Sequence, residues 1–257
     1  MLSSISSLFK TAYYNTVKNS KVLSLSIIIA GSISILLALI FLGDLTSMNN
    51  EENNINDLSS LIALLIPWLA SPLYLASLYI SYQGYTAKKV TYHDILKPLS
   101  YLLPILALEF ILVMIPASIQ LFFTFIFDTY LILFFTNMMA LIFYKLFDYA
   151  GLYLLLTKKT IPVSLSASLQ RCYPVLFKLI YIDMIFGLCL LLCAIPITFV
   201  SILLALIVGN IAYIIQFIFI FFSIVFYFNL RGIIFSELFP ELSPIEAKTM
   251  NDDTFIS

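Results

Sequence analysis

The stretch Ile211–Leu230, IAYIIQFIFIFFSIVFYFNL, decides the fold, because it runs for 20 residues without a charged side chain. The hydrocarbon core of a bilayer is about 30 Å thick, and roughly 20 mainly apolar residues cross it as a helix. A strand of a membrane barrel has about 10 residues of alternating polarity, whereas this run is apolar on every side. A helix satisfies its backbone hydrogen bonds within one segment, so we expect a membrane-spanning helix here.

The composition of the whole chain extends this interpretation. Of the 257 residues, 62% are hydrophobic and 11% are charged, and the mean hydropathy is +1.05. A soluble domain is roughly 45–50% apolar and about 25% charged, and disorder requires low hydrophobicity with high charge. Three Cys are too few for the disulfide framework of a small secreted protein. The 13 Lys and Arg are balanced by 14 Asp and Glu, so the chain lacks the excess of positive charge that is typical of nucleic-acid-binding proteins. The class that remains is an integral membrane protein.

Five more apolar segments reach spanning length, which predicts an all-α protein with six transmembrane helices in a single membrane domain, 1–257. The predicted spans are Val22–Gly43, Leu58–Tyr82, Leu99–Phe127, Tyr130–Leu156, Tyr173–Pro196 and Ile211–Leu230. We expect the first span to stay in the mature protein, because it is longer than the apolar core of a signal peptide and no small-residue cleavage site closes it.

The positive charges fall on one side of this six-span arrangement. They precede the first span, lie between the second and third spans, surround the connection between the fourth and fifth spans, and follow the sixth span, whereas the other connections are acidic or neutral. Lys and Arg are in excess on the cytoplasmic side, so both termini are predicted to be cytoplasmic. The residues are Lys10, Lys18, Lys21, Lys88, Lys89, Lys97, Lys145, Lys158, Lys159, Arg171, Lys178, Arg231 and Lys248.

Three short segments are predicted to form helices on the cytoplasmic surface of the membrane. Residues 2–18 form an amphipathic lead, whose apolar face carries Leu2, Ile5, Leu8, Phe9 and Ala12. The other two segments follow Lys88-Lys89 and Lys158-Lys159, and their patterns are offset by 70 residues. One interpretation is an internal repeat of three units, each an interfacial helix followed by a helical hairpin. The other is coincidence in an apolar sequence.

Proline gives a further expectation for the fifth span. Pro196 is expected to end or kink that helix, because proline removes a backbone donor and clashes with the preceding turn. Residues 197–208 are too few to cross the membrane alone. Three paths are compatible with their sequence: an extension outside the bilayer, a strongly tilted segment, or a position in the membrane interface.

Two acidic residues are candidates for an intramembrane polar site. Glu109 and Asp183 each lie about ten residues into their spans, which is roughly 15 Å deep, and charged residues at such depth are rare and often functional. One hypothesis is a proton or cation site made by both carboxylates. The alternative is a helix–helix contact. In that case Glu109 pairs with Lys178, or either acid bonds to Asn137, Gln120 or a Tyr hydroxyl. Lys145 and Asp148 are three residues apart on one helix and are predicted to pair.

The sequence predicts no catalytic residue, no metal site and no cofactor, so we do not expect an enzyme. Cys189 and Cys193 share a helix face, but a zinc site requires about four ligands. His93 is the single His of the chain and is expected at the surface. The sequence contains no glycine-rich phosphate loop and no G-x-S-x-G nucleophile elbow.

Lipids are the partners that the sequence indicates. Lys88, Lys89, Lys158 and Lys159 are predicted to lie near anionic headgroups, where each basic residue contributes about 1 kcal/mol of attraction. The other interpretation, which is compatible with the first, is that these lysines only set the topology. The sequence identifies no protein partner.

Three parts of the chain carry a family resemblance. They are the Ser-rich lead Ser4–Lys18, the loop Ser81–Pro98 that runs into Leu103-Pro104, and the block Leu156–Lys159 followed by Val163–Leu169. This layout resembles the YciC-like family of bacterial inner-membrane proteins, whose biochemical role is undefined. The resemblance implies a bacterial inner membrane and supplies no catalytic residues. We expect a non-catalytic envelope or interaction component, and the alternative is a small permease or ion-coupled carrier that uses Glu109 and Asp183.

Overall fold

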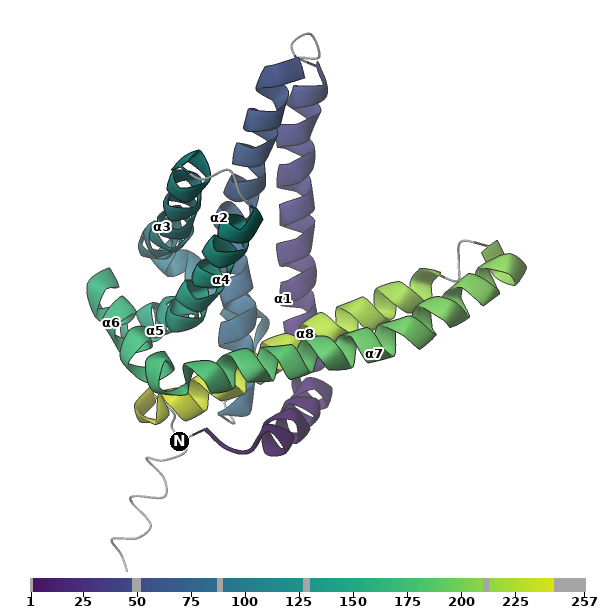
Figure 1. Ribbon diagram of the computed structural model, residues 1–257. Coiled ribbons are helices and arrows are strands. Elements are labelled where there is room, and N and C mark those ends of the chain that lie inside the picture. Colours follow the sequence, from purple (N-terminus) through teal and green to yellow (C-terminus); the bar gives the residue numbers. More distant parts are fainter. Residues whose placement is uncertain (1, 48–51, 87–89, 127–129, 210–212, 243–257) are drawn as a thin grey trace, which may run out of the picture. The chain divides into compact units, whose positions relative to one another are not determined.

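The computed structural model consists of helices joined by short turns (Figure 1). It describes residues 2–47, 52–86, 90–126, 130–209 and 213–242. These residues contain no strand, so the predicted all-α class is confirmed for the described part of the chain. The elements are α1 (Ile5–Ser47), α2 (Glu52–Tyr85), η1 (Tyr92–Tyr101), α3 (Leu102–Ile126), α4 (Tyr130–Phe147), α5 (Ala150–Thr157), α6 (Ile161–Cys172), η2 (Tyr173–Val175), α7 (Leu176–Val208), α8 (Tyr213–Leu238) and η4 (Pro240–Leu242).

Five helical segments are long and apolar enough to cross a membrane, and they overlap the first, third, fourth, fifth and sixth predicted spans. The second predicted span, Leu58–Tyr82, lies within α2, but the side chains of residues 58–67 lie outside the described part of the chain. The count of six spans therefore stays a prediction. The five segments are Ser20–Ile40, Tyr92–Ile119, Phe134–Thr157, Ile161–Leu204 and Tyr213–Leu238.

The chain groups into two compact units. The first unit contains Met1–Ser20, Ser81–Lys88 and Pro174–Ser257, and the second contains Lys21–Ile80 and Lys89–Tyr173. The long helices α1 and α2 therefore each contribute residues to both units. The single membrane domain expected from the sequence stays a prediction.

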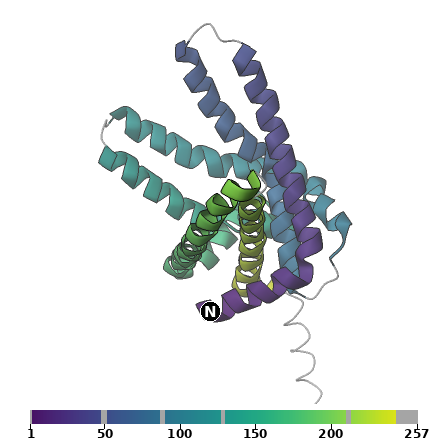
Figure 2. The ribbon, with the colours of Figure 1, turned by 90° about the vertical axis from the view of Figure 1, so that its right-hand side faces the viewer.

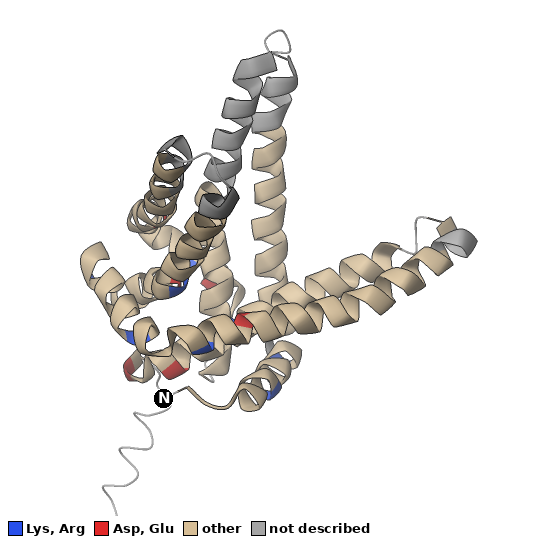
Figure 3. Ribbon diagram, viewed as in Figure 1, with Lys and Arg blue, Asp and Glu red and all other residues tan. Residues whose placement is uncertain are grey.

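A hairpin of α7 and α8 forms most of the first unit. The two helices lie side by side (Figures 1 and 2). Charged side chains gather near the ends opposite the connecting turn, and the rest of the described hairpin is uncharged (Figure 3). Large apolar side chains such as Leu188, Phe199 and Phe217 are exposed along it. Helices that are apolar all round are typical of membrane spans, and so much exposed apolar surface is rare in soluble monomers.

The helix α7 does not end at Pro196, one of the two expectations for this proline, but continues to Val208, so residues 197–208 are helical. A kink at Pro196 stays a prediction. A proline costs one backbone hydrogen bond, which a membrane helix tolerates when neighbouring groups compensate. Pro196 is also exposed, so its ring does not disturb a packed contact. The 33 residues of α7 extend about 50 Å at about 1.5 Å per residue.

The second unit packs α3, α4, α5, α6 and η1 together. The short helices predicted after the two lysine pairs are both present, as η1 and α6. They differ in type, because η1 is a 3-10 helix and α6 is an α-helix, and the internal repeat stays a prediction. A capping box begins η1, in which Asp94 Oδ2 accepts hydrogen bonds from the N–H and the hydroxyl of Thr91 at 2.8 and 2.9 Å.

The predicted fourth span, Tyr130–Leu156, is divided into two helices. α4 ends at Phe147 and α5 begins at Ala150, with a turn between them. The predicted pair of Lys145 and Asp148 is confirmed, because its nitrogen and oxygen are 3.3 Å apart, and it lies at this turn. The sequence does not predict this turn, since two residues leave little trace in the hydropathy of an apolar run.

The predicted amphipathic lead forms the beginning of α1, which runs from Ile5 to Ser47 as one helix. Leu8 and Ala12 on its predicted apolar face are buried, whereas Lys10 on the opposite side is exposed. This outcome confirms the amphipathic helix from Ile5 on, whereas residues 2–4 precede the helix, and its position on the cytoplasmic surface stays a prediction. In the second unit, the hydroxyls of Ser26 and Ser77 lie 2.9 Å apart and join α1 to α2.

Gly232 allows a close approach between α8 and the end of α2 in the first unit. A Cβ atom added to Gly232 would lie 2.8 Å from the backbone nitrogen of Tyr82 and would also overlap Ser81 Oγ. Real Cβ atoms do not come so close to a backbone, so this position requires glycine. A Cβ atom added to Gly187 on α7 would meet nothing within 4 Å.

Gly232→Ala is therefore expected to lower the free energy of unfolding by about 1–3 kcal/mol, the usual cost of overpacking. Gly187→Ala, the matched control, is expected to be neutral or slightly stabilising, because alanine favours helix. The midpoint of thermal unfolding in detergent, followed by circular dichroism, measures both effects. Equal midpoints for the two variants would contradict the close approach at Gly232.

Candidate functional site

The two acidic residues of the predicted polar site lie in different units. Glu109 belongs to α3 in the second unit, and Asp183 belongs to α7 in the first. The structure gives the contacts of each residue only within its own unit. A shared proton or cation site therefore stays a prediction, as does a pairing of Glu109 with Lys178.

Glu109 lies next to Gly151 of α5. A Cβ atom added to Gly151 would lie 3.5 Å from Glu109 Oε1 and 3.5 Å from Leu75 Cδ1, which is ordinary van der Waals contact. The Glu109 carboxylate also interacts electrostatically with the hydroxyl of Tyr144 on α4. Among the described residues Glu109 has no hydrogen bond or ion pair, and Asn137, one predicted partner, is exposed. The side chain of Gln120, another predicted partner, lies outside the described residues.

Lys178, the third residue of the predicted site, holds the first residues of the chain. Its Nζ donates hydrogen bonds to the carbonyl oxygens of Leu2 and Ser3, at 2.6 and 2.8 Å. Ser3 in turn donates from its backbone N–H and its hydroxyl to the carboxylate of Glu237, at 2.7 and 2.6 Å. We name these four residues, Leu2, Ser3, Lys178 and Glu237, the terminal clamp. The terminal clamp ties the residues before α1 to both helices of the α7–α8 hairpin.

Tyr85, at the end of α2, lies close to the terminal clamp. Burial raises the pKa of its hydroxyl and the Glu237 carboxylate raises this pKa further, whereas a hydrogen bond with Ser236 lowers it. The phenol is therefore neutral over the physiological pH range, and it adds no negative charge beside Glu237.

Asp183 lies near an aromatic stack between α7 and α8. The rings of Phe186 and Tyr227 stack with centroids 5.2 Å apart, and the Arg231 guanidinium lies 5.6 Å from the centroid of the Tyr227 ring. The Asp183 carboxylate interacts electrostatically with the Tyr227 hydroxyl. The stack of Phe186 on Tyr227 joins α7 to α8, whereas the contact between Tyr227 and Arg231 lies within α8.

Asn229 on α8 is the centre of a buried polar network in the first unit. Its Oδ1 accepts hydrogen bonds from Asn15 Nδ2 and Ser81 Oγ, at 2.8 and 3.1 Å. Its Nδ2 donates to Thr16 Oγ1 and to the carbonyl oxygen of Val225, both at 3.0 Å. An amide side chain offers two donors and accepts two hydrogen bonds, so Asn229 is fully satisfied. We name Asn15, Thr16, Ser81 and Asn229 the Asn229 network.

The Asn229 network joins three segments that are distant in the sequence. Asn15 and Thr16 lie in α1, Ser81 lies near the end of α2, and Asn229 lies in α8. Polar side chains bond across helices where water is scarce, and a fully satisfied network fixes one arrangement of them. The network contains no acid, base or strong nucleophile, so its role is structural.

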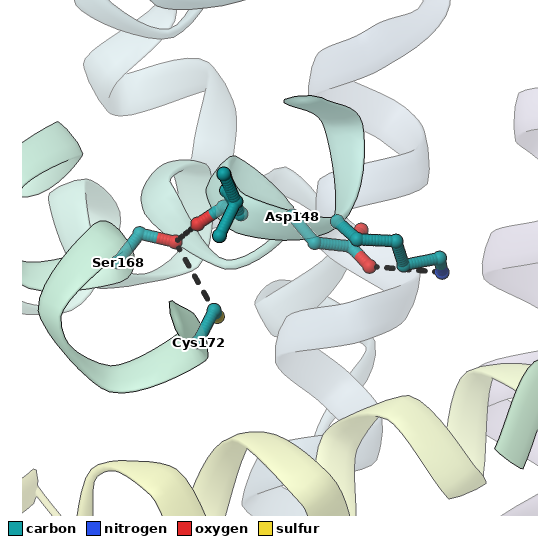
Figure 4. A network of polar contacts seen from close by, with 5 residues as sticks. Asp148, Ser168 and Cys172 are labelled. Carbon is teal, nitrogen blue, oxygen red and sulfur yellow. Dashed lines mark hydrogen bonds and ion pairs between the residues drawn. The ribbon is translucent and has the colours of Figure 1, made fainter. Parts of the chain in front are cut away.

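A smaller polar network joins α4 to α6 in the second unit (Figure 4). Ser168 Oγ donates to the carbonyl oxygen of Leu146 at 2.9 Å and lies 3.8 Å from Cys172 Sγ. Leu146 belongs to the last turn of α4, where carbonyl groups lack a partner within the helix. Ser168 therefore supplies a hydrogen bond that the end of α4 lacks, and the pair of Lys145 and Asp148 lies nearby (Figure 4).

The described residues line a groove in each unit. The groove of the first unit, of about 500 Å³, is lined by apolar residues of α7 and α8 such as Phe186, Leu190 and Ile220. The second, of about 380 Å³, lies where the start of α3 meets the turn between α5 and α6. Neither groove is lined by Glu109 or Asp183.

Metal-binding side chains are not gathered in the described part of the chain, which contains no group of three His, Cys, Asp or Glu that could hold an ion. Cys189 and Cys193 are exposed on α7, and Cys172 is buried on α6. His93 is exposed in η1, as the sequence predicts.

Sequence reasoning missed the Asn229 network and the terminal clamp. Asn229 is an amide near the end of an otherwise apolar run, which is a usable signal for an interhelical contact. Ser3 and Ser81 resemble many other serines of the chain and give no such signal. Comparisons with protein-family models, with curated proteins and with solved structures give no match to this chain.

Asn229→Ala is expected to remove the hydrogen bonds that Asn229 makes with Asn15, Thr16 and Ser81 and to lower the free energy of unfolding by about 1–3 kcal/mol. Asn137→Ala, which removes an exposed amide on α4, is the matched control and is expected to have no effect. Thermal unfolding of both purified variants in the same detergent measures the difference. A wild-type midpoint for Asn229→Ala would show that the network does not stabilise the first unit.

Proposed function

We propose that this chain is a multi-pass protein of a bacterial inner membrane, with six spans and both termini in the cytoplasm. We propose further that it acts as a non-catalytic envelope or interaction component. Membrane lipids are its proposed partners, with anionic headgroups near Lys88, Lys89, Lys158 and Lys159. The resemblance to the YciC-like family supports the bacterial location.

The observation that carries this proposal is that the described polar side chains form hydrogen bonds that join one helix to another. The Asn229 network joins α1, α2 and α8, Ser168 joins α6 to α4, and the terminal clamp holds the first residues against α7 and α8. A scaffold requires polar contacts that fix its helices, whereas a carrier requires polar groups along a substrate path. The contacts named above fix helices against one another, which supports the scaffold.

The charge distribution supports the proposed orientation. The described hairpin of α7 and α8 carries its charged residues away from the turn at Gly209, and Lys158 and Lys159 are exposed before α6. Only a topology with an even number of spans places all basic residues of the sequence on one side.

A small permease or ion-coupled carrier is the second candidate, and Glu109 is the observation that favours it. A carboxylate inside a span is costly unless it is paired or protonated, and Glu109 has no hydrogen-bond partner among the described residues. An unpaired acid of this kind is suited to taking up and releasing a proton.

Reporter fusions test the proposed topology. A fluorescent protein that matures only in the cytoplasm is expected to be bright at either terminus, because an even number of spans returns the chain to its starting side. Alkaline phosphatase, which is active only outside, is expected to be inactive at both termini. Opposite results at the two termini would rule out six spans.

Proton flux separates the scaffold from the carrier. Vesicles that contain the wild-type protein and a trapped pH-sensitive dye are expected to equilibrate an imposed pH difference as slowly as protein-free vesicles. Glu109→Gln and Asp183→Asn are expected to behave in the same way. A faster wild-type flux that either substitution abolishes would favour the carrier and contradict the scaffold.

A further inference from the structure

The groove of about 380 Å³ in the second unit has an apolar floor and a polar rim. Leu103, Pro104 and Ala107 line it from the start of α3, and Leu154 lines it from α5. Its volume is within the range of about 300–1,000 Å³ that is typical of small-molecule sites. The floor therefore offers room for part of an acyl chain beside the end of a span.

The polar rim of the groove is formed by Tyr101, Lys159 and Thr160. The Lys159 side chain is exposed, and within the described part of the chain neither Lys158 nor Lys159 forms an ion pair. Thr160 precedes α6 without using its hydroxyl as a helix cap. A cation and a hydroxyl therefore remain available beside an apolar surface.

The turn that carries these groups has a defined conformation. Lys158 adopts a left-handed backbone conformation with φ of 53°, and its N–H donates to the carbonyl oxygen of Leu154 at 2.9 Å. The Tyr101 hydroxyl donates to the carbonyl oxygen of Lys158 at 3.5 Å, which links η1 to the turn. These bonds hold Lys159 at the mouth of the groove, so the rim exists before a ligand arrives.

We propose that this groove binds one anionic glycerophospholipid. Its phosphate lies at Lys159 and Thr160, and the beginning of one acyl chain lies along Leu103, Ala107 and Leu154. The charge of the rim matches the phosphate, and the apolar floor matches the chain. The inference rests on the proposed function, because it requires the turn before α6 to lie at the surface of the membrane.

Fluorescence quenching in vesicles tests the site. Trp68 is the single tryptophan of the chain, and its Nε1 donates to the carbonyl oxygen of Leu106 at 2.8 Å, one residue before Ala107. Vesicles of phosphatidylcholine with a minor fraction of phosphatidylglycerol are prepared with bromine on the acyl chains of one lipid or of the other. Per brominated lipid, phosphatidylglycerol is expected to quench Trp68 more strongly than phosphatidylcholine, because it is enriched in the groove.

Four variants define the source of this excess quenching. Lys159→Gln removes the cation and is expected to reduce the preference about fivefold, the equivalent of one basic contact. Ala107→Leu fills the floor and is expected to reduce the preference while every charge is retained. Ala117→Leu on the same helix and Lys10→Gln on α1 are the matched controls, and both are expected to keep the wild-type preference.

The inference is overturned if the wild-type protein shows no preference, if Lys159→Gln and Ala107→Leu both retain it, or if Lys10→Gln reduces it as much as Lys159→Gln. The last result would indicate diffuse attraction in place of a site. Vesicle quenching does not depend on the direction in which the chain is inserted. A failed topology test and a failed lipid test are therefore distinguishable.

Discussion

A polar side chain buried in a protein must find its hydrogen bonds within that protein, and the first unit depends on this constraint at Asn229. The amide uses all of its donors and acceptors and thereby sets where α1, α2 and α8 meet. Gly232 lies three residues further along α8, and its missing side chain lets the backbone of α2 approach. Ser81 takes part in both contacts, so hydrogen bonding and close packing reinforce each other at one place.

The second unit uses the same physical means at different points. Glu109 of α3 lies next to Gly151 of α5, and Ser168 satisfies a carbonyl group at the end of α4. Small and weakly polar residues thus lie where these helices meet, while large apolar residues such as Phe134 and Met139 are exposed. Lipid offers no hydrophobic drive for helices to associate, so contacts of this kind supply the specificity.

Much of the helical fold could be predicted from the sequence, because long apolar runs have few alternatives in a membrane. The Lys145–Asp148 pair was predictable since helical spacing alone brings its members together. The continuation of α7 through Pro196 and the turn after Phe147 were not, because each depends on local compensation that hydropathy does not record. The Asn229 network was hidden for another reason, since Asn15 and Asn229 are 214 positions apart.

The terminal clamp has a consequence for biosynthesis. Ser3 and Glu237 are separated by 234 positions, so the serine leaves the ribosome long before its carboxylate partner exists. At about 5–20 residues per second, this interval is roughly 10–50 s. During that time the N–H and the hydroxyl of Ser3 lack the carboxylate that accepts their hydrogen bonds in the folded unit. Completion of the first unit is therefore a late event of maturation, which only the arrival of α8 can trigger.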